Sequence, residues 1–308
     1  MTKFETSKVR GKVLLDTSLS KFNTWGVGGN AECLFVPADL KDLAVFLAAT
    51  DKQVPVTWLG LGSNVLVRDG GISGVVIITQ SGLRELEFQD GGIVYAQAGL
   101  ACAKLARNAI SRGYTGIEFM AGIPGTVGGA LAMNAGAFGG QTWEKVISVD
   151  VINRDGEIRT RNAGEYEVDY RSVKQRKDEW FVGARFLLSK KSDQEKIISI
   201  KELLDKRSAT QPIGKKNCGS VFKNPQGTYA AKLIEQCGLK GYRIGGACVS
   251  EKHANFIINE SNASAKDIED LINHVQQTVH QKCGIQLETE VKFLGCLLYT
   301  SDAADELT

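Results

Sequence analysis

The pattern of hydrophobic and polar residues predicts a chain that alternates short strands with amphipathic helices. Leu40, Leu43, Phe46 and Leu47 fall on one helical face, and Asp39 before them is a suitable N-cap. Short apolar runs typical of buried strands cover residues 54–59, 75–78, 93–98, 146–153 and 179–188. Asp155-Gly156 is a favourable hairpin turn between two of them.

Three further helices are predicted by apolar residues at helical spacing. One contains Leu105, Ala106, Ala109 and Ile110 and ends at Gly113; another contains Ile197, Ile200, Leu203 and Leu204. The clearest contains Ile268, Leu271, Ile272, Val275 and Val279, begins with the capping-box pair Ser264 and Asp267, and stops at Gly284. A last strand is predicted over residues 285–294.

Strands and helices mix in every segment, so the sequence predicts α+β or α/β domains. The length of 308 residues suggests about two domains, or three small ones. A polar break at residues 190–193 begins a third segment. We therefore expect boundaries at 1–80, 81–192 and 193–295, with a tail at 296–308 that has no usable periodicity.

Composition is that of an ordinary globular protein, with 43% hydrophobic and 23% charged residues, which excludes disordered and fibrous classes. Lys and Arg number 37 and Asp and Glu 35, a balance that argues against a dedicated DNA-binding protein. Glycine is unusually frequent at 34 residues, against only 5 prolines. These glycines indicate tight turns or close approach of the backbone to a ligand.

The seven cysteines are widely spaced and form no Cys-x-x-Cys motif, and the three histidines lie far from any cysteine pair at ligand spacing. We expect reduced thiols, no disulfide scaffold and no metal site. Residues 1–10 contain no apolar run that could serve as a signal peptide, and no run is long enough to span a membrane. The expectation is a soluble cytoplasmic protein.

Two glycine-rich loops, at residues 60–64 and 122–129, are the main chemical clue. Backbone N–H groups in such loops can converge on phosphate oxygens. Neither loop is a P-loop or a Rossmann fingerprint, so the expected ligand is a nucleotide or dinucleotide held by another architecture. The alternative is that the glycines only make turns, but two loops flanked by Ser63, Asn64, Thr126 and Asn134 favour binding.

Six motifs follow one another along the chain: residues 23–29 (NTWGVGG), 60–66 (GLGSNVL), 121–129 (AGIPGTVGG), 169–172 (DYRS), 219–225 (GSVFKNP) and 287–291 (LETEV). Through these motifs the chain resembles the UDP-N-acetylenolpyruvoylglucosamine reductase (MurB) family of peptidoglycan synthesis. The resemblance extends over about residues 22–295, nearly the whole chain. The compact spacing around Ser220 is similar to the type II subclass, which lacks an extra substrate-covering segment found in type I.

This resemblance implies an α+β protein with an FAD-binding fold of the vanillyl-alcohol-oxidase (PCMH) type in two subdomains, and a C-terminal α+β substrate-binding domain. The implied cofactor residues are Gly60, Gly62, Ser63, Asn64, Gly122, Ile123, Pro124, Gly125, Thr126, Gly128, Gly129 and Asn134. The first histidine is His253, outside both loops, so we expect FAD to be bound noncovalently.

The implied reaction passes a hydride from NADPH through FAD to the enolpyruvyl ether of UDP-N-acetylglucosamine enolpyruvate. Ser220 is the implied proton donor, Arg171 the charge stabiliser and Glu290 an acid at the developing enolate. Without the resemblance these would be a turn residue, a surface arginine and an outward-facing strand residue. Glu288 shares the face of Glu290 at period two, so pattern alone does not choose between them.

Tyr170, Lys223 and Asn224 are the implied substrate contacts. The surrounding residues 201–260 hold ten basic and five acidic residues, and this excess would attract a pyrophosphate, although a solvated face is the alternative. We expect no nucleic acid, membrane or obligate protein partner. Two competing functions are another FAD-dependent oxidoreductase of the same fold and a nucleotide-binding module without catalysis.

Overall fold

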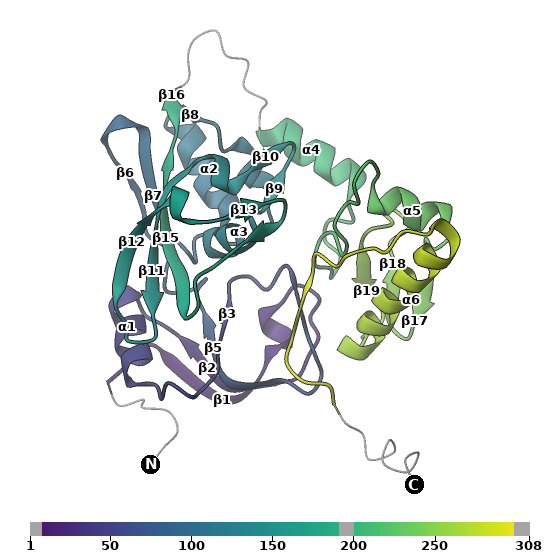
Figure 1. Cartoon of the computed structure of the whole chain (residues 1–308), viewed down its shortest axis with the longest axis horizontal. Helices are drawn as coiled ribbons and strands as arrows, with labels where there is room; N and C mark the ends of the chain where they lie inside the picture. Colours follow the sequence, from purple (N-terminus) through teal and green to yellow (C-terminus); the bar gives the residue numbers. More distant parts are fainter. Residues whose placement is uncertain (1–7, 191–199, 299–308) are drawn as a thin grey trace. The chain divides into compact units, whose positions relative to one another are not determined.

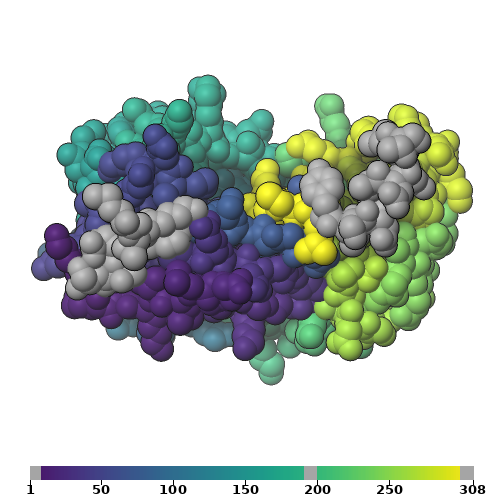
Figure 2. All heavy atoms as spheres, turned by 90° about the horizontal axis from the view of Figure 1, so that it is seen from below, coloured from purple at the N-terminus to yellow at the C-terminus, as the bar shows by residue number. Residues whose placement is uncertain are grey.

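The computed structural model describes residues 8–190 and 200–298 (Figure 1). Its N-terminal part is a four-stranded sheet in the order β1-β2-β5-β3, made of β1 (Lys12–Ser18), β2 (Asn30–Val36), β5 (Ile72–Ile78) and β3 (Val56–Leu59). Figure 2 shows N-terminal residues as a broad purple surface. In β1 the side chains of Leu14 and Leu15 are exposed.

Helix α1 (Leu40–Ala49) follows β2 and begins as the sequence predicts. The Asp39 carboxylate accepts a hydrogen bond from the Asp42 N–H at 2.8 Å, which confirms the predicted N-cap. The apolar face of the helix is buried, and the Phe46 ring stacks on Phe35 of β2 with centroids 3.9 Å apart. This aromatic contact joins the helix to the strand that precedes it.

By the contacts between its residues the chain divides into two units, each built from several segments. The first unit comprises the described parts of Met1–Leu14, Leu34–Leu61 and Val76–Ala209; the second comprises those of Leu15–Cys33, Gly62–Val75 and Thr210–Thr308. The expected division at residues 80, 192 and 295 stays a prediction. Each unit is described by itself below.

The first unit is centred on a five-stranded antiparallel sheet in the order β12-β11-β15-β7-β6. Its strands are β6 (Leu86–Phe88), β7 (Ile93–Gln97), β11 (Val146–Asn153), β12 (Ile158–Asn162) and β15 (Glu179–Leu187). Helices α2 (Cys102–Ser111) and α3 (Val127–Met133) share one hydrophobic core with it. Gly156, with φ +77°, lies in the turn between β11 and β12, as predicted.

Two short hairpins and one short pair of distant strands complete the first unit and carry several candidate residues. The hairpins are formed by β9 (Gly136–Ala137) with β10 (Gly140–Gln141) and by β13 (Val168–Asp169) with β14 (Ser172–Val173), whereas β8 (Tyr114–Thr115) pairs with β16 (Ser189–Lys190) from much later in the chain. Helix α4 (Ile200–Thr210) contains three of the four residues of the predicted helix, and the fourth, Ile197, lies outside the described residues.

The second unit has its own core around a long helix, α6 (Ala265–Cys283), and a shorter one, α5 (Ala230–Gln236). They pack with a three-stranded sheet made of β17 (Arg243–Ile244), β18 (Ala247–Val249) and β19 (Ile257–Asn259). A separate pair is formed by β20 (Lys292–Leu294), which runs parallel to β4 (Val65–Val67). The Trp25 indole is fully buried in this core and donates to the Ile257 carbonyl at 2.9 Å.

Helix α6 begins and ends where the sequence predicts. The Ser264 hydroxyl accepts from the Asp267 N–H at 3.0 Å, the Asp267 carboxylate accepts from the Ser264 N–H at 3.0 Å, and Gly284 is left-handed with φ +70°. Asp69 adds two more caps, since its carboxylate accepts from the N–H groups of Ala265 and Lys266. The helix start is therefore fully bonded, as a buried helix end requires.

The predicted last strand is wrong in its extent. Only Lys292–Leu294 forms a sheet strand, whereas residues 285–291 belong to no sheet and contribute a single isolated bridge at Thr289. The reason is that the segment pairs with a loop: the Lys223 N–H donates to the Glu288 carbonyl at 2.9 Å, and the Glu290 N–H donates to the Val221 carbonyl at 2.8 Å. An apolar run predicts an extended chain but does not say what the chain pairs with.

All seven cysteines are free, and five of them are buried. Among the residues that the structure describes, no three or more His, Cys, Asp or Glu side chains are grouped so as to hold a metal ion. No helix within 8–190 and 200–298 is long and apolar enough to cross a membrane.

We expect Ser264→Ala to lower the free energy of unfolding by about 1 kcal/mol, because the Asp267 N–H at the start of α6 loses its acceptor. Lys266→Ala is the control, because its exposed ammonium forms only a surface pair with Asp270. Urea unfolding followed by circular dichroism measures both. Equal losses in the two variants would mean that the capping box does not stabilise the helix.

Candidate functional site

The end of strand β3 and the residue before α3 approach each other closely in the first unit. A Cβ atom on Gly60 would overlap the Thr126 Oγ1 atom, so residue 60 has no room for a side chain. A cavity of about 110 Å³ lies beside this contact. Its lining comes from six segments of the unit: Trp58, Leu59, Gly60, Thr79, Ala98, Gly128, Gly129, Ala132, Gln175, Trp180 and Phe181.

Two buried side-chain donors near Gly60 lack a hydrogen-bond partner in the part of the chain that the structure describes. Within residues 8–190 and 200–298, no hydrogen-bond partner reaches Thr126 Oγ1 or Trp58 Nε1. Leaving a buried polar atom unpaired costs about 1–3 kcal/mol, so each such atom calls for an explanation, of which a bound polar ligand is one. The Trp58 ring is held by stacking on Trp180, with centroids 5.3 Å apart.

Sequence reasoning missed Trp58, Trp180 and Gln175. The available signal was the indole of Trp58 two residues before Gly60, which places it on the same strand face as the glycine. Trp180 could not be predicted, because only the pairing of β15 with β7 and β11 brings it to this cavity.

Much of the backbone of the second glycine loop is hydrogen-bonded to other parts of the chain. The N–H groups of Ile123, Gly125, Val127 and Gly128 donate to carbonyls of Met120, Ile123, Leu100 and Ala98. Gly122 is buried, and a Cβ on it would overlap the Phe138 ring. A Cβ on Gly128 would lie 2.8 Å from the Ala98 Cβ, whereas one on the exposed Gly129 would meet only Thr126 Oγ1 at 3.8 Å. Packing alone thus explains Gly122 and Gly128, and Gly129 is the glycine left open to a ligand.

Gly62, Ser63 and Asn64 of the first glycine loop belong to the second unit. Gly62 has φ +66°, and a Cβ atom added there would overlap the Phe22 carbonyl oxygen. The Gly62 carbonyl accepts a hydrogen bond from the Thr24 N–H at 3.1 Å. The Asn64 side chain donates to the Glu290 carbonyl at 3.1 Å. Ser63 between them is half-buried. Asn64 therefore links the glycine loop to the segment that carries Glu290.

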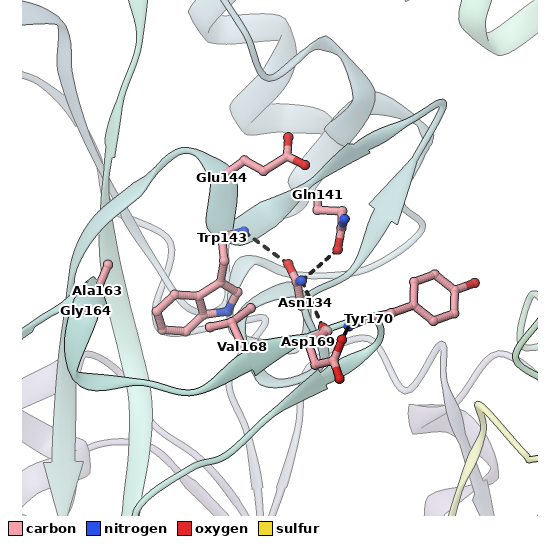
Figure 3. A pocket seen from close by; sticks show the side chains of 9 residues that line it. All are labelled: Asn134, Gln141, Trp143, Glu144, Ala163, Gly164, Val168, Asp169 and Tyr170. Atoms are coloured by element: carbon pink, nitrogen blue, oxygen red, sulfur yellow. Dashed lines mark hydrogen bonds between the residues drawn. The ribbon is translucent and has the colours of Figure 1, made fainter. Parts of the chain in front are cut away.

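Asn134 lies at the centre of a second cavity of the first unit, about 580 Å³ in volume (Figure 3). Its left-handed backbone, with φ +46°, ends α3. Its amide group donates to Gln141 Oε1 at 2.8 Å and to the Asp169 carbonyl at 3.1 Å, and its Oδ1 accepts from the Trp143 N–H at 3.2 Å. Asn134 was predicted as a cofactor contact, and in this structure its side chain joins three segments of the chain.

Arg171 is anchored to the same loop. It occupies the turn of the β13–β14 hairpin with φ +54°, and its Nη1 and Nη2 donate to the carbonyls of Asn134 and Gly136 at 3.2 and 2.8 Å. Its Cζ lies 5.1 Å from the centroid of the Tyr170 ring, which is 42% exposed. Two fixed bonds and an aromatic neighbour orient the guanidinium, so Arg171 is not the mobile surface arginine of the alternative interpretation.

In the second unit the backbone brings the Ser220 and Glu290 segments together. The Val221 carbonyl accepts from the Glu290 N–H at 2.8 Å, and Phe222 forms an antiparallel bridge with Thr289. Before them, the Asn217 side chain accepts from the N–H of Gly219, which has φ +80°. This turn places the half-buried Ser220 beside the pairing, at residues that lie about seventy positions apart in the sequence.

The two carboxylates that the pattern could not separate have different surroundings. The Glu288 side chain is 72% exposed and pairs with Lys223 at 2.5 Å, whereas Glu290 is half-buried. Burial, and then the charge of the nearby Glu290, raise the pKa of the Cys218 thiol. Glu290 is thus the carboxylate held against the protein interior.

Lys223 and Asn224 are positioned by the same pairing between the Ser220 and Glu290 segments. The Lys223 side chain is only 19% exposed, so its ammonium is held between the protein and Glu288. The Asn224 side chain accepts from the Ala230 N–H at 3.1 Å, at the start of α5. Ser220, Lys223, Asn224 and Glu290 therefore form one cluster in the second unit, and Tyr170 and Arg171 form another in the first.

Comparison with known proteins gives the class first. Residues 31–162 match a family model described as an FAD binding domain, and residues 211–294 match the model of the UDP-N-acetylenolpyruvoylglucosamine reductase C-terminal domain. The chain is therefore an FAD-binding oxidoreductase with a further C-terminal domain, and the expected α+β fold class is confirmed.

The relatives give the particular family. The chain is 48% identical over 314 residues to the UDP-N-acetylenolpyruvoylglucosamine reductase of Coxiella burnetii (strain Dugway 5J108-111), covering 96% of this chain and 99% of that one. It is 50% identical over 296 residues to that of Legionella pneumophila (strain Corby), covering 96% of each. The solved reductase (MurB) from Thermus caldophilus superposes with a TM-score of 0.79 at 31% identity, over 93% of this chain and 99% of that one. The chain belongs to the UDP-N-acetylenolpyruvoylglucosamine reductase family.

The residues around Gly60 fit part of a cofactor of this class, since a cavity of about 110 Å³ has room for only a fragment of it. They combine a strand end without a side chain, two unsatisfied buried donors and a stacked indole pair. A molecule with phosphate oxygens and aromatic rings offers acceptors for the donors and a flat surface for the indoles.

We expect Thr126→Val to lower FAD affinity about 5- to 30-fold, since the hydroxyl would lose a hydrogen bond to the cofactor. The same change should leave the cofactor-free protein as stable or more stable, because it removes an unpaired buried hydroxyl. Flavin fluorescence titration and thermal melts of the stripped protein measure the two effects.

Thr142→Val is the matched control. The fully buried Thr142 hydroxyl donates to the Ala135 carbonyl at 2.7 Å, so its removal should destabilise the cofactor-free protein instead. Unchanged FAD affinity in Thr126→Val would remove the Thr126 hydroxyl from the cofactor site.

Proposed function

We propose that this chain reduces UDP-N-acetylglucosamine enolpyruvate to UDP-N-acetylmuramate, with NADPH as reductant, as a step of peptidoglycan precursor synthesis. The observation that carries the proposal is the pairing of the Ser220 segment with the Glu290 segment, inside the region that matches the reductase C-terminal domain. General relatives with an FAD-binding domain need not contain this cluster.

FAD, when bound, accepts a hydride from NADPH and supplies one to the methylene carbon of the enolpyruvyl ether. The chain's own residues then have two tasks. They must stabilise the negative charge that grows on the enolpyruvyl carboxylate side, and they must bring a proton to the neighbouring carbon.

Ser220 has the role of proton donor. A serine is a weak acid, so it serves only against a carbanion-like centre in a site that is already organised. The bonded turn at Asn217 and Gly219 and the pairing of Val221 with Glu290 support this role, because both fix the backbone on either side of Ser220.

Glu290 and Arg171 have the role of stabilising charge. A half-buried carboxyl at Glu290 can hydrogen-bond the developing enolate as a neutral acid. The guanidinium of Arg171 stays protonated and is held by the Asn134 and Gly136 carbonyls, which suits it to a carboxylate. Asn134 then acts indirectly, by positioning Arg171.

Tyr170, Lys223 and Asn224 have the role of substrate contacts. The Lys223 ammonium is desolvated on one side and would bind a phosphate in exchange for Glu288.

In this proposal residues 193–295 form the substrate domain, residues 1–80 and 81–192 form the cofactor subdomains, and the subclass is type II. The reaction is cytoplasmic, where NADPH is available and the free thiols stay reduced.

We expect FAD to be noncovalently bound, since the first histidine is His253 and it lies in the second unit, outside the FAD-binding match at residues 31–162. Acid precipitation of the yellow protein should leave the colour in the supernatant. Colour kept in the fully denatured pellet would contradict this expectation.

Ser220→Ala should separate the two halves of the reaction. Bleaching of the flavin by NADPH should stay nearly unchanged, and reoxidation by the UDP-enolpyruvyl sugar should slow at least about 10²–10⁴-fold, the range of a lost general acid. Ser220→Cys should recover part of the rate, because a thiol still donates a proton. Stopped-flow absorbance follows both halves.

Equal slowing of both halves in Ser220→Ala would point to displaced flavin, and an unaffected second half would assign the proton to another group. A wild-type protein that NADPH bleaches but the UDP-sugar does not reoxidise would favour another FAD-dependent oxidoreductase. A purified protein without flavin would favour the noncatalytic nucleotide-binding module.

Glu290→Gln should slow only the second half, through loss of an acidic hydrogen-bond donor, by about 10²-fold or more. Glu288→Gln is the matched control, because that exposed carboxylate contacts Lys223 and should alter KM for the UDP-sugar with little change in kcat. Single-turnover and steady-state kinetics distinguish the two. A larger kcat loss at Glu288 would reverse the assignment.

A further inference from the structure

Two thiols of the second unit lie in contact although the proposed reaction uses neither. The Sγ atoms of Cys237 and Cys283 are 3.7 Å apart. Cys237 follows the last residue of α5, and Cys283 is the last residue of α6. Their sulfurs would have to approach by only about 1.7 Å to reach the length of a disulfide bond.

The surroundings of the pair give it a defined route of attack. The Cys237 side chain is buried at 5% exposure, whereas Cys283 is half-buried and accessible to a small oxidant. The Lys282 ammonium donates to the Cys237 carbonyl at 3.0 Å and holds the two helix ends together. Both helices end here, and Gly284 after α6 is left-handed, so the backbone around each thiol is not locked inside a helix.

We propose that Cys237 and Cys283 form a reversible disulfide that ties the end of α5 to the end of α6. A peroxide first oxidises the Cys283 thiol to a sulfenic acid, and the peroxide O–O bond is reduced to an alcohol or water. The Cys237 thiol then attacks that sulfur, the S–S bond forms, and water leaves. A thiol such as dithiothreitol reverses the step by exchange.

The bond would constrain the part of the chain that supports the substrate cluster. It closes a loop that contains α6 and the strands β17, β18 and β19. Asn224 caps the first residue of α5, and the chain after Gly284 leads to Glu288, the partner of Lys223. Cross-linking these helix ends restricts the unfolded chain, and thereby stabilises the unit.

Burial and the contact with Cys283 raise the pKa of the Cys237 thiol, and the Lys282 charge opposes them. Cys237 must lose its proton before it attacks, since the thiolate is the attacking form, so bond formation is expected to become faster as the pH rises.

The test uses the full-length FAD-bound protein in a Cys296→Ser background, because the exposed Cys296 thiol could link two molecules. The protein is treated with hydrogen peroxide, free thiols are alkylated, and tryptic peptides are analysed by mass spectrometry. We expect one linked pair containing Cys237 and Cys283, and a Tm raised by about 5 °C that dithiothreitol reverses.

Cys237→Ser and Cys283→Ser should each abolish both the linked peptide and the rise in Tm. Cys248→Ser is the matched control, because this buried thiol of the same unit bonds only the Val249 carbonyl, and it should keep both effects. Alkylation of both Cys237 and Cys283 after peroxide, or separate oxidation of each to a sulfinic acid, would overturn the proposal. A linked pair with unchanged Tm would overturn its stabilising role. None of these outcomes depends on the proposed reductase activity, which is measured separately.

Discussion

The absence of a side chain at residue 60 is the constraint on which the candidate cofactor site depends. Because Thr126 Oγ1 occupies the place that a Cβ would take, the end of β3 can reach the start of α3 only with glycine. That approach places Thr126 against Gly60, which lines one cavity together with Trp58, and among the described residues neither the Thr126 hydroxyl nor the Trp58 indole N–H has a hydrogen-bond partner. Each unpaired donor destabilises the cofactor-free chain, and a ligand that supplies acceptors removes this cost when it binds.

The second glycine loop illustrates how one sequence signal can have two physical causes. Gly122 and Gly128 are explained by Phe138 and Ala98, which leave no space for a Cβ, and four backbone amides of the loop bond within the chain. The rule that glycine loops expose amides to phosphate therefore holds for only part of this motif. The loop contributes an internally hydrogen-bonded backbone that carries the Thr126 hydroxyl and the open position at Gly129.

Local signals made the helices predictable, and long-range pairing limited the rest. The caps at Asp39 and Ser264 and the stop at Gly284 depend on residues three or four positions apart, so the sequence alone determines them. Residues 285–291 look like a strand but pair with a loop about seventy residues earlier, which no periodicity reveals. Trp180 reaches its cavity through the same kind of distant pairing.

The same limit explains why Glu288 and Glu290 could not be told apart. Alternation along a regular strand places both on one face, but the Val221 carbonyl accepts from the N–H groups of both Glu290 and Val291, which interrupts that alternation. The interruption leaves Glu288 exposed beside Lys223 and Glu290 half-buried. Two like charges in one sequence motif thus acquire different environments, and a carboxyl that is to act as an acid needs the less solvated one.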